Sequence, residues 1–221
     1  HTHFEYALPN EHSTAYFEAR LAYLPDQHQI VAVIRNITER KEYEKNLLSQ
    51  AQRAKVLLEL PKLADTLKTE KEFLQTALKK IELLTGSTLS FIHLLNEDED
   101  SIELVAWSES GPNSYCTIVT DKHYPIKQAG IWADAFRKRH PIMVNNPKNT
   151  SMQGLPEGQS KLNRFISLPV MSKDKVKMLV GVGNKHQVYT DADLETVQLI
   201  ANEIWRTAQN RRTNLHLRKL A

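Results

Sequence analysis

The hydrophobic pattern near the N-terminus predicts β-structure. Residues 14–23 alternate between apolar and polar side chains, as a half-buried strand does. Residues 30–34 form a continuous run rich in β-branched side chains, and the turn-forming stretch 25–28 separates the two segments. Residues 3–8 are a candidate third strand. Three strands bury too little surface for a core of their own, so we expect more of this unit to lie before His1.

A helix is expected to follow, with Asn36 or Thr38 as its N-cap. Arg40 and Glu44 occupy the start of a seam with heptad-like spacing. Its apolar members are Leu47, Ala51, Ala54 and Leu58. This spacing favours a modest coiled coil, and the alternative is a surface helix packed on its own domain. Pro61 is expected to kink or end the helix.

The second half of the chain mixes helices and strands. The capping-box sequence Thr69–Glu72 opens a helix, and Gly86 provides its stop signal. The apolar face of this helix is formed by Phe73, Ala77, Ile81 and Leu84. We expect strands to follow at about 88–95 and 101–107, and then a short helix after Gly130. The last predicted strands are one at 141–144 and a hairpin of 165–171 with 176–182. This order predicts an antiparallel sheet with helices packed on it, an α+β domain.

The last helix is expected to run from near Asp191 to the end of the chain. Its apolar positions repeat at heptad-compatible spacing: Leu194, Val197, Ala201, Ile204, Ala208 and Leu215. Arg211 and Arg218 occupy the remaining positions of this seam. One small domain cannot cover so long a helix, so its distal half is expected to pair with another helix.

Composition narrows the class of protein. Hydrophobic residues make up 41% and charged residues 25% of the 221 residues, which is ordinary for a globular protein. The net charge of +3 is too weak to favour nucleic acid or an anionic membrane as a partner. The single cysteine, Cys116, allows no internal disulfide and fits a reducing cytoplasm. No apolar run reaches the length of a membrane span.

Residues 14–42 resemble the C-terminal hairpin of a PAS domain. The resemblance is carried by Phe17–Arg20, by Val31–Arg35, and by the junction Asn36–Lys41. The family usually has Asp-Ile-Thr at this junction, and Asn36 replaces the Asp. The replacement removes a carboxylate that in the family typically pairs with a nearby basic residue.

Residues 56–212 resemble a GAF domain of bacterial multidomain sensors. The matching stretches are 57–64, 83–86, 130–135, 154–158, 167–170 and 180–185. The resemblances together divide the chain into a PAS fragment (1–38), a signalling helix (39–60), a GAF domain (61–205) and a C-terminal signalling helix (206–221). The heptad-like seams of the two helices predict a homodimer formed through the N- and C-terminal helices. The resemblances imply an output domain, a histidine kinase, GGDEF or HD-GYP domain, after the last helix.

The GAF resemblance implies a ligand pocket between the sheet and the loops that cover one face. The candidates for its lining are Trp107, Cys116, Trp132, Asn145 and Arg164, and Ser108 is a further candidate for contact with an anion. Aromatic walls with few polar groups suit a small molecule. The alternative is that both tryptophans are ordinary core residues. Neither the ligand nor a cofactor is identified by the sequence.

Asn184-Lys185, Tyr189 and Asp193 resemble a signature of cyclic-nucleotide GAF domains, although Tyr189 replaces a Phe and Leu194 a Glu. We interpret Lys185 and Asp193 as structural, because the lysine can reach the acidic side chain at the start of the last helix.

Other chemistry has little support in the sequence. Cys116 is a candidate for bilin attachment or redox sensing, but a buried small side chain is the better interpretation because no Asp-Ile-Pro stretch accompanies it. His93 is expected to point inward from a strand, and the histidines show no metal-ligand spacing. No catalytic motif is present. We therefore expect a non-enzymatic sensor and relay module. A ligand-free dimerisation spacer is the alternative, and an enzyme is a distant third.

Overall fold

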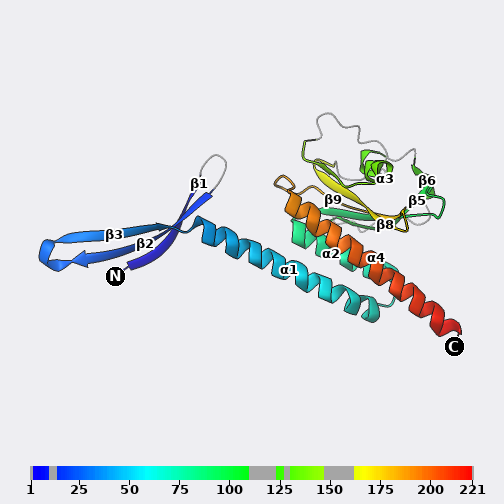
Figure 1. Cartoon of the computed structure of the whole chain (residues 1–221), viewed down its shortest axis with the longest axis horizontal. Coiled ribbons are helices and arrows are strands. Elements are labelled where there is room, and N and C mark those ends of the chain that lie inside the picture. The colour runs from blue at the N-terminus through cyan, green and yellow to red at the C-terminus, as the bar shows by residue number, and fades with distance from the viewer. Residues whose placement is uncertain (1, 10–13, 110–122, 127–129, 147–161, 221) are drawn as a thin grey trace. The chain divides into compact units, whose positions relative to one another are not determined.

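The computed structural model describes residues 2–9, 14–109, 123–126, 130–146 and 162–220. The chain divides into two compact units, His1–Gln52 and Arg53–Ala221. Figure 1 shows the elements of both. Each unit is considered by itself below.

The first unit contains a three-stranded antiparallel sheet. Its strands are β1 (Thr2–Pro9), β2 (Thr14–Leu24) and β3 (Gln29–Asn36), with β2 in the middle. A single 3-10 turn, Pro25–Gln27, joins β2 to β3, and His28 after it adopts a left-handed conformation with φ 53°. The hairpin expected from residues 14–34 is therefore present, and so is the third strand.

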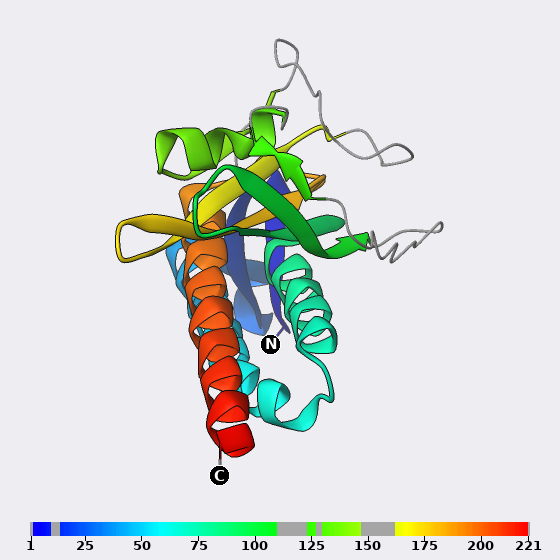
Figure 2. The same ribbon diagram turned by 90° about the vertical axis from the view of Figure 1, so that its right-hand side faces the viewer.

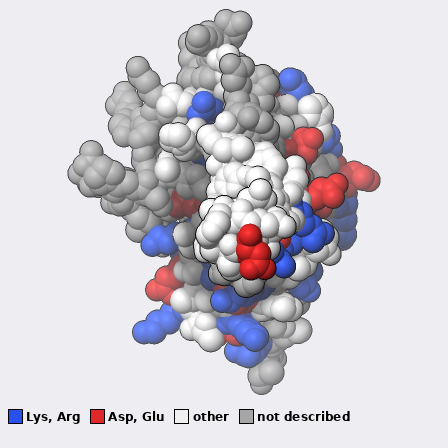
Figure 3. Space-filling view, turned by 90° about the vertical axis from the view of Figure 1, so that its left-hand side faces the viewer, with Lys and Arg blue, Asp and Glu red and all other residues white. Residues whose placement is uncertain are grey.

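This sheet has little core, as its strand count predicted. Among the described residues of its strands, Ala19 is the buried hydrophobic one, and Ile37 just after β3 is buried as well. Every residue of β3 is exposed, and Ile30 and Ile34 are 69% and 59% exposed. Figure 3 shows a patch of mostly uncharged atoms at the centre of its view.

Helix α1 (Thr38–Thr66) begins in the first unit and ends in the second. Its start is capped by Asn36, whose side-chain oxygen accepts a hydrogen bond of 2.9 Å from the Thr38 amide. The helix does not end at Pro61, which was one of the two outcomes expected there. Leu60 and Ala64, on either side of Pro61, are both buried. Their burial offsets the backbone hydrogen bond that proline cannot make.

A six-stranded antiparallel sheet forms the centre of the second unit. Its order is β6 (His123–Pro125), β5 (Ser101–Glu109), β4 (Leu89–Leu95), β9 (Lys175–Gly183), β8 (Phe165–Ser172) and β7 (Ile142–Val144). Helices α2 (Glu70–Thr85) and α4 (Asp191–Leu220) cover one face. The short helices η3 (Ile131–Ala133) and α3 (Asp134–Lys138) lie over the other face (Figure 2). The predicted α+β fold is confirmed.

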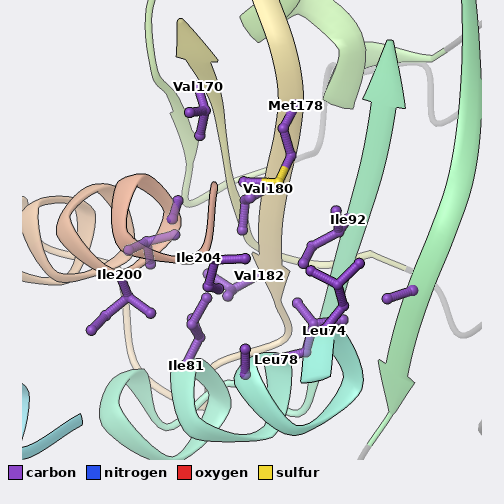
Figure 4. Close-up of a cluster of buried hydrophobic side chains, with 14 of the residues drawn as sticks. Leu74, Leu78, Ile81, Ile92, Val170, Met178, Val180, Val182, Ile200 and Ile204 are labelled. Atoms are coloured by element: carbon purple, nitrogen blue, oxygen red, sulfur yellow. The ribbon is translucent and has the colours of Figure 1, made fainter. Parts of the chain in front are cut away.

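The helical face of the sheet carries an aliphatic core (Figure 4). Ile92, Val180 and Val182 project from the strands toward Ile81 of α2 and Ile204 of α4. The proximal positions of the seam predicted in the last helix, Val197, Ala201, Ile204 and Ala208, are all buried here. The seam therefore packs on its own domain as far as Ala208. The pairing of the distal half with another chain stays a prediction.

Both caps of α2 match the sequence prediction. Thr69 and Glu72 form a capping box, in which each side chain bonds the backbone amide of the other. Gly86 takes the left-handed conformation that ends the helix, with φ 67°.

The distal part of α4 contacts the connection between α1 and α2. Arg211, a position of the predicted seam, donates to the carbonyl oxygens of Ala64, Leu67 and Lys68. Arg212 pairs with Glu70 at the start of α2. Arg211 thus satisfies carbonyl groups that the end of α1 leaves without helical partners.

Candidate functional site

Aromatic side chains gather on the face of the large sheet opposite α2 and α4. The Phe91 ring stacks on Trp107 at 5.9 Å between centroids, and it meets Trp132 edge-on at 5.7 Å. His93 stacks on Trp132 at 4.3 Å, with 16° between the ring planes. We call Phe91, His93, Trp107 and Trp132 the aromatic cluster.

Strand geometry explains how these residues meet. Phe91 and His93 are two positions apart on β4, so both side chains point to the same face. Trp107 is the partner of Phe91 in the β4–β5 register and therefore shares that face. Trp132 comes from η3, which covers this side of the sheet. Its carbonyl accepts a 2.7 Å hydrogen bond from the Ser167 hydroxyl.

Gly181 makes room for the cluster. It is the register partner of Phe91 on β9, and a Cβ atom there would lie 2.1 Å from the tip of the Phe91 ring. No side chain fits at that distance. The glycine therefore allows the Phe91 ring to lie over β9.

Burial sets the charge state of His93. This residue is 4% exposed, and desolvation lowers the pKa of its imidazole to about 3. The ring is accordingly neutral at physiological pH. Trp132 is 2% exposed. The cluster is thus a neutral, amphipathic aromatic layer with polar ring nitrogens.

The structure brings two of the predicted ligand-binding residues together and places two elsewhere. Trp107 and Trp132 are both in the aromatic cluster and both buried. Asn145 and Arg164 instead bond to the segment between β9 and α4. Cys116 lies outside the described residues. Roles for these residues in ligand binding stay predictions.

The segment 184–190 joins β9 to α4. The Lys185 ammonium lies 2.8 and 2.7 Å from the two carboxylate oxygens of Asp193, the contact expected from the sequence. Asp193 also accepts a 2.8 Å bond from the Thr190 amide at the start of α4. The Tyr189 hydroxyl pairs with that of Ser87 at 2.7 Å. Burial raises the pKa of Tyr189 to about 12, so this hydroxyl stays protonated.

A model described as GAF domain matches residues 68–207. The chain belongs to the GAF domain family. The GAF domain so defined contains the whole aromatic cluster and the proximal part of α4. The PAS resemblance of residues 14–42 stays a prediction.

A curated relative of this GAF protein is a sensor. It is the methyl sulfide methyltransferase-associated sensor of Methanosarcina acetivorans, 30% identical over 204 residues that cover 90% of this chain and 20% of the relative. The chain thus spans about a fifth of the relative's length. That organism is an archaeon, whereas the sequence resemblance was to bacterial sensors.

Solved structures share the fold. Residues 122 to 287 of a methyl-accepting chemotaxis protein match with a TM-score of 0.58 and 15% identity, over 70% of this chain and 97% of that one. Free methionine-R-sulfoxide reductase from Neisseria meningitidis, in complex with its substrate, matches with a TM-score of 0.51 and 14% identity, over 72% of this chain and 87% of that one. The GAF fold therefore occurs both in signalling proteins and in an enzyme.

Sequence reasoning missed part of the cluster. His93 was expected to point inward, but its stacking on Trp132 was not foreseen, and Phe91 and Gly181 were not singled out. The period-two alternation of β4 places Phe91 and His93 on one face. Only the strand pairing reveals that Gly181 lies beside them.

The described residues contain no group of three His, Cys, Asp or Glu side chains placed to hold a metal ion. No helix among them has the length and apolar character needed to cross a bilayer.

Proposed function

We propose that this GAF domain is a sensory domain that binds a small ligand at the aromatic cluster and transmits the binding through α4. The observation that carries the proposal is the unequal make-up of the two faces of the sheet. The helical face is packed with aliphatic side chains. The opposite face holds the two tryptophans, Phe91 and His93 under a short covering helix. Aromatic walls with few polar groups are typical of small-molecule sites.

The relay belongs to the helical face of the sheet, on which α4 packs. Helix α4 packs along the helical core and then continues to the connection between α1 and α2. A ligand that shifted β4 or η3 would change the surface on which α4 rests, and α4 would bias an output domain. A relay of this kind needs two states that differ by a few kcal/mol.

A homodimer through the helices is part of the proposal. The predicted seam of α1, Leu47, Ala51, Ala54 and Leu58, is exposed along its whole length. Exposed apolar stripes of this kind favour pairing with another helix. We further propose that the module regulates a histidine kinase, GGDEF or HD-GYP domain and that the chain itself is not an enzyme. The sensor among its relatives supports a sensory rather than a catalytic function.

One observation favours the alternative of a ligand-free dimerisation spacer. Trp132 is 2% exposed and stacked tightly on His93, which is also how an ordinary core tryptophan packs. Both functions include a homodimer. They differ in whether a ligand displaces the Trp132 side chain.

A thermal-shift titration separates them. The purified chain is titrated with cyclic nucleotides, small carboxylates and common metabolites, and the same panel is applied to Trp132→Ala, Trp132→Phe and the control Trp205→Ala. Trp205 lies on α4, away from the cluster. A ligand at 100 times its Kd stabilises the folded state by about 2.7 kcal/mol. A rise in Tm that survives in Trp205→Ala and disappears in the Trp132 variants supports the sensor. A flat response across the panel favours the spacer.

A further inference from the structure

A row of polar residues crosses one end of the large sheet. Strands β7 and β8 pair up to Val144 and Phe165, so Asn145 and Arg164 are the next position in register. The row continues to β9, where the Asn184 amide donates a 2.9 Å hydrogen bond to the Arg164 carbonyl. Asn145, Arg164 and Asn184 thus end three neighbouring strands at the same level.

Two members of this row hold the segment 184–190. The Asn145 side chain makes two hydrogen bonds to the backbone of Tyr189, from its nitrogen to the carbonyl at 2.9 Å and from the Tyr189 amide to its oxygen at 2.6 Å. The Arg164 guanidinium donates to the carbonyls of Lys185 and His186 at 3.3 and 3.2 Å. A side-chain amide that pairs with both backbone groups of one residue does what a further strand would do.

The held segment leads directly into α4. Thr190 caps the helix through Asp193, and the Leu194 amide bonds the Thr190 carbonyl at 3.1 Å. Tyr189 cannot turn freely, because it is 2% exposed and its hydroxyl is bonded to Ser87. A displacement of Asn145 is therefore passed to the first turn of α4 and is not absorbed by rotation of Tyr189.

We propose that Asn145 and Arg164 are positioning residues that couple the β7–β8 edge of the sheet to the first turn of α4. This inference rests on the proposed function in one respect, since it gives the coupling a purpose only if α4 carries a signal. The two side chains act on α4 through their hydrogen bonds to Tyr189 and to the carbonyls of the segment 184–190. The coupling itself is a property of the chain without any ligand.

Native-state hydrogen exchange of the free chain tests the coupling. The readout is the exchange of the Asp193 and Leu194 amides, which Asn145 does not contact. In Asn145→Leu, both hydrogen bonds to Tyr189 are lost. The two amides are then expected to exchange about tenfold faster, the factor expected when roughly one to two ordinary hydrogen bonds are removed. Asn145→Asp keeps the acceptor for the Tyr189 amide and is expected to show a smaller increase.

Two control variants separate coupling from general destabilisation. Asn163→Ala removes a side chain beside the row, while the backbone amide of residue 163 still donates to Asn184. Ser167→Ala breaks a buried bond on β8 that points to Trp132, on the other face. Neither variant is expected to accelerate exchange at Asp193 and Leu194.

The outcomes are decisive in both directions. Faster exchange confined to the start of α4 in the Asn145 variants supports the proposal. Equal acceleration in Ser167→Ala, or a uniform rise over all amides of the domain, overturns it. Because no ligand enters this experiment, its result is independent of the thermal-shift titration. A flat thermal-shift titration would favour the spacer and would leave the coupling measurable.

Discussion

The two sheets of this protein differ in what covers them. The large sheet ends in β6 and β7, which have three residues each, and both of its faces are packed. The small sheet ends in β1 and β3, each of eight residues, and its outer strands are almost wholly exposed. Both sheets are rich in β-branched and aromatic residues. Local strand propensity therefore does not distinguish them, and only burial does.

The comparison shows where each unit's stability resides. In the large sheet, the strands lie between two layers of side chains, so substitutions there should lower the free energy of unfolding strongly. In the small sheet, long edges and open faces are features that favour association with further chain segments. All three tryptophans, Trp107, Trp132 and Trp205, belong to the second unit. Tryptophan fluorescence therefore reports on the second unit alone.

The largest expected difference comes from enlarging a small residue in each sheet. Gly181→Val places side-chain atoms inside the Phe91 ring, because even a Cβ would lie 2.1 Å from it. We expect a loss of about 3 kcal/mol or more in the free energy of unfolding. Ala32→Val on the exposed β3 is expected to change stability by less than about 0.5 kcal/mol. Urea unfolding measures the first by fluorescence, and hydrogen exchange of β2 and β3 measures the second. Similar values at the two sites would contradict the comparison.

Truncation of isoleucine gives the next largest contrast. Ile81 is fully buried between α2 and the sheet, whereas Ile34 is 59% exposed. Ile81→Ala is expected to cost about 2–5 kcal/mol because it opens a cavity in the aliphatic core. Ile34→Ala should cost no more than about 0.5 kcal/mol. The same two measurements apply, and a costly Ile34→Ala would show that the small sheet is covered in solution.

Acid is expected to affect the two units over different pH ranges. His93 has its pKa lowered to about 3 by burial, so the unfolded chain binds a proton there below about pH 6.5 and the folded chain does not. The second unit should lose about 2 kcal/mol between pH 7.5 and pH 5 from this group. The Arg20 hydrogen bond lowers the pKa of Glu18 in the first unit. The stability that the ionised Glu18 carboxylate contributes to the first unit is lost only as the pH falls below about 4.5.

Unfolding at several pH values tests this difference. Tryptophan fluorescence follows the second unit, and His93→Phe serves as the control because it cannot titrate. In the variant, the free energy of unfolding of the second unit should change less between pH 7.5 and pH 5. An unchanged slope would mean that another group is responsible.

A smaller effect than those at the buried residues is expected at the cap of α1. Asn36→Ala removes the side-chain acceptor of the Thr38 amide and should destabilise the start of the helix by about 1 kcal/mol. Hydrogen exchange of the Lys41 amide, which bonds the Ile37 carbonyl, reports on this turn. Asn36→Asp, which restores the acceptor, should exchange like the original chain. A large loss in the second unit would be unexpected.

Sequence patterns predicted the elements that local physics determines. The capping box at Thr69 and Glu72, the stop at Gly86 and the hairpin of β8 and β9 are set by residues close together in the chain. The fold class followed from the order of these elements. The Lys185–Asp193 contact followed from the GAF resemblance.

Contacts between distant residues were beyond that reasoning. Arg211 was placed in a seam by its spacing, but it bonds carbonyls about 145 positions earlier in the chain, at the end of α1. The hydrogen bonds from Asn145 to the backbone of Tyr189 were not foreseen, and a role for Asn145 in ligand binding stays a prediction. Pro61 was expected to kink or end a helix, and the helix does not end there. For Arg211 and Asn145 the deciding partner is remote in sequence.

The alternation along β4 also has an evolutionary consequence. Phe91 and His93 face the aromatic cluster, while Ile92 between them belongs to the aliphatic core on the other side. Odd and even positions of one strand are therefore subject to separate selection. Under the function proposed above, exchange of the odd positions would alter recognition of the ligand, while the even positions would keep the aliphatic core packed.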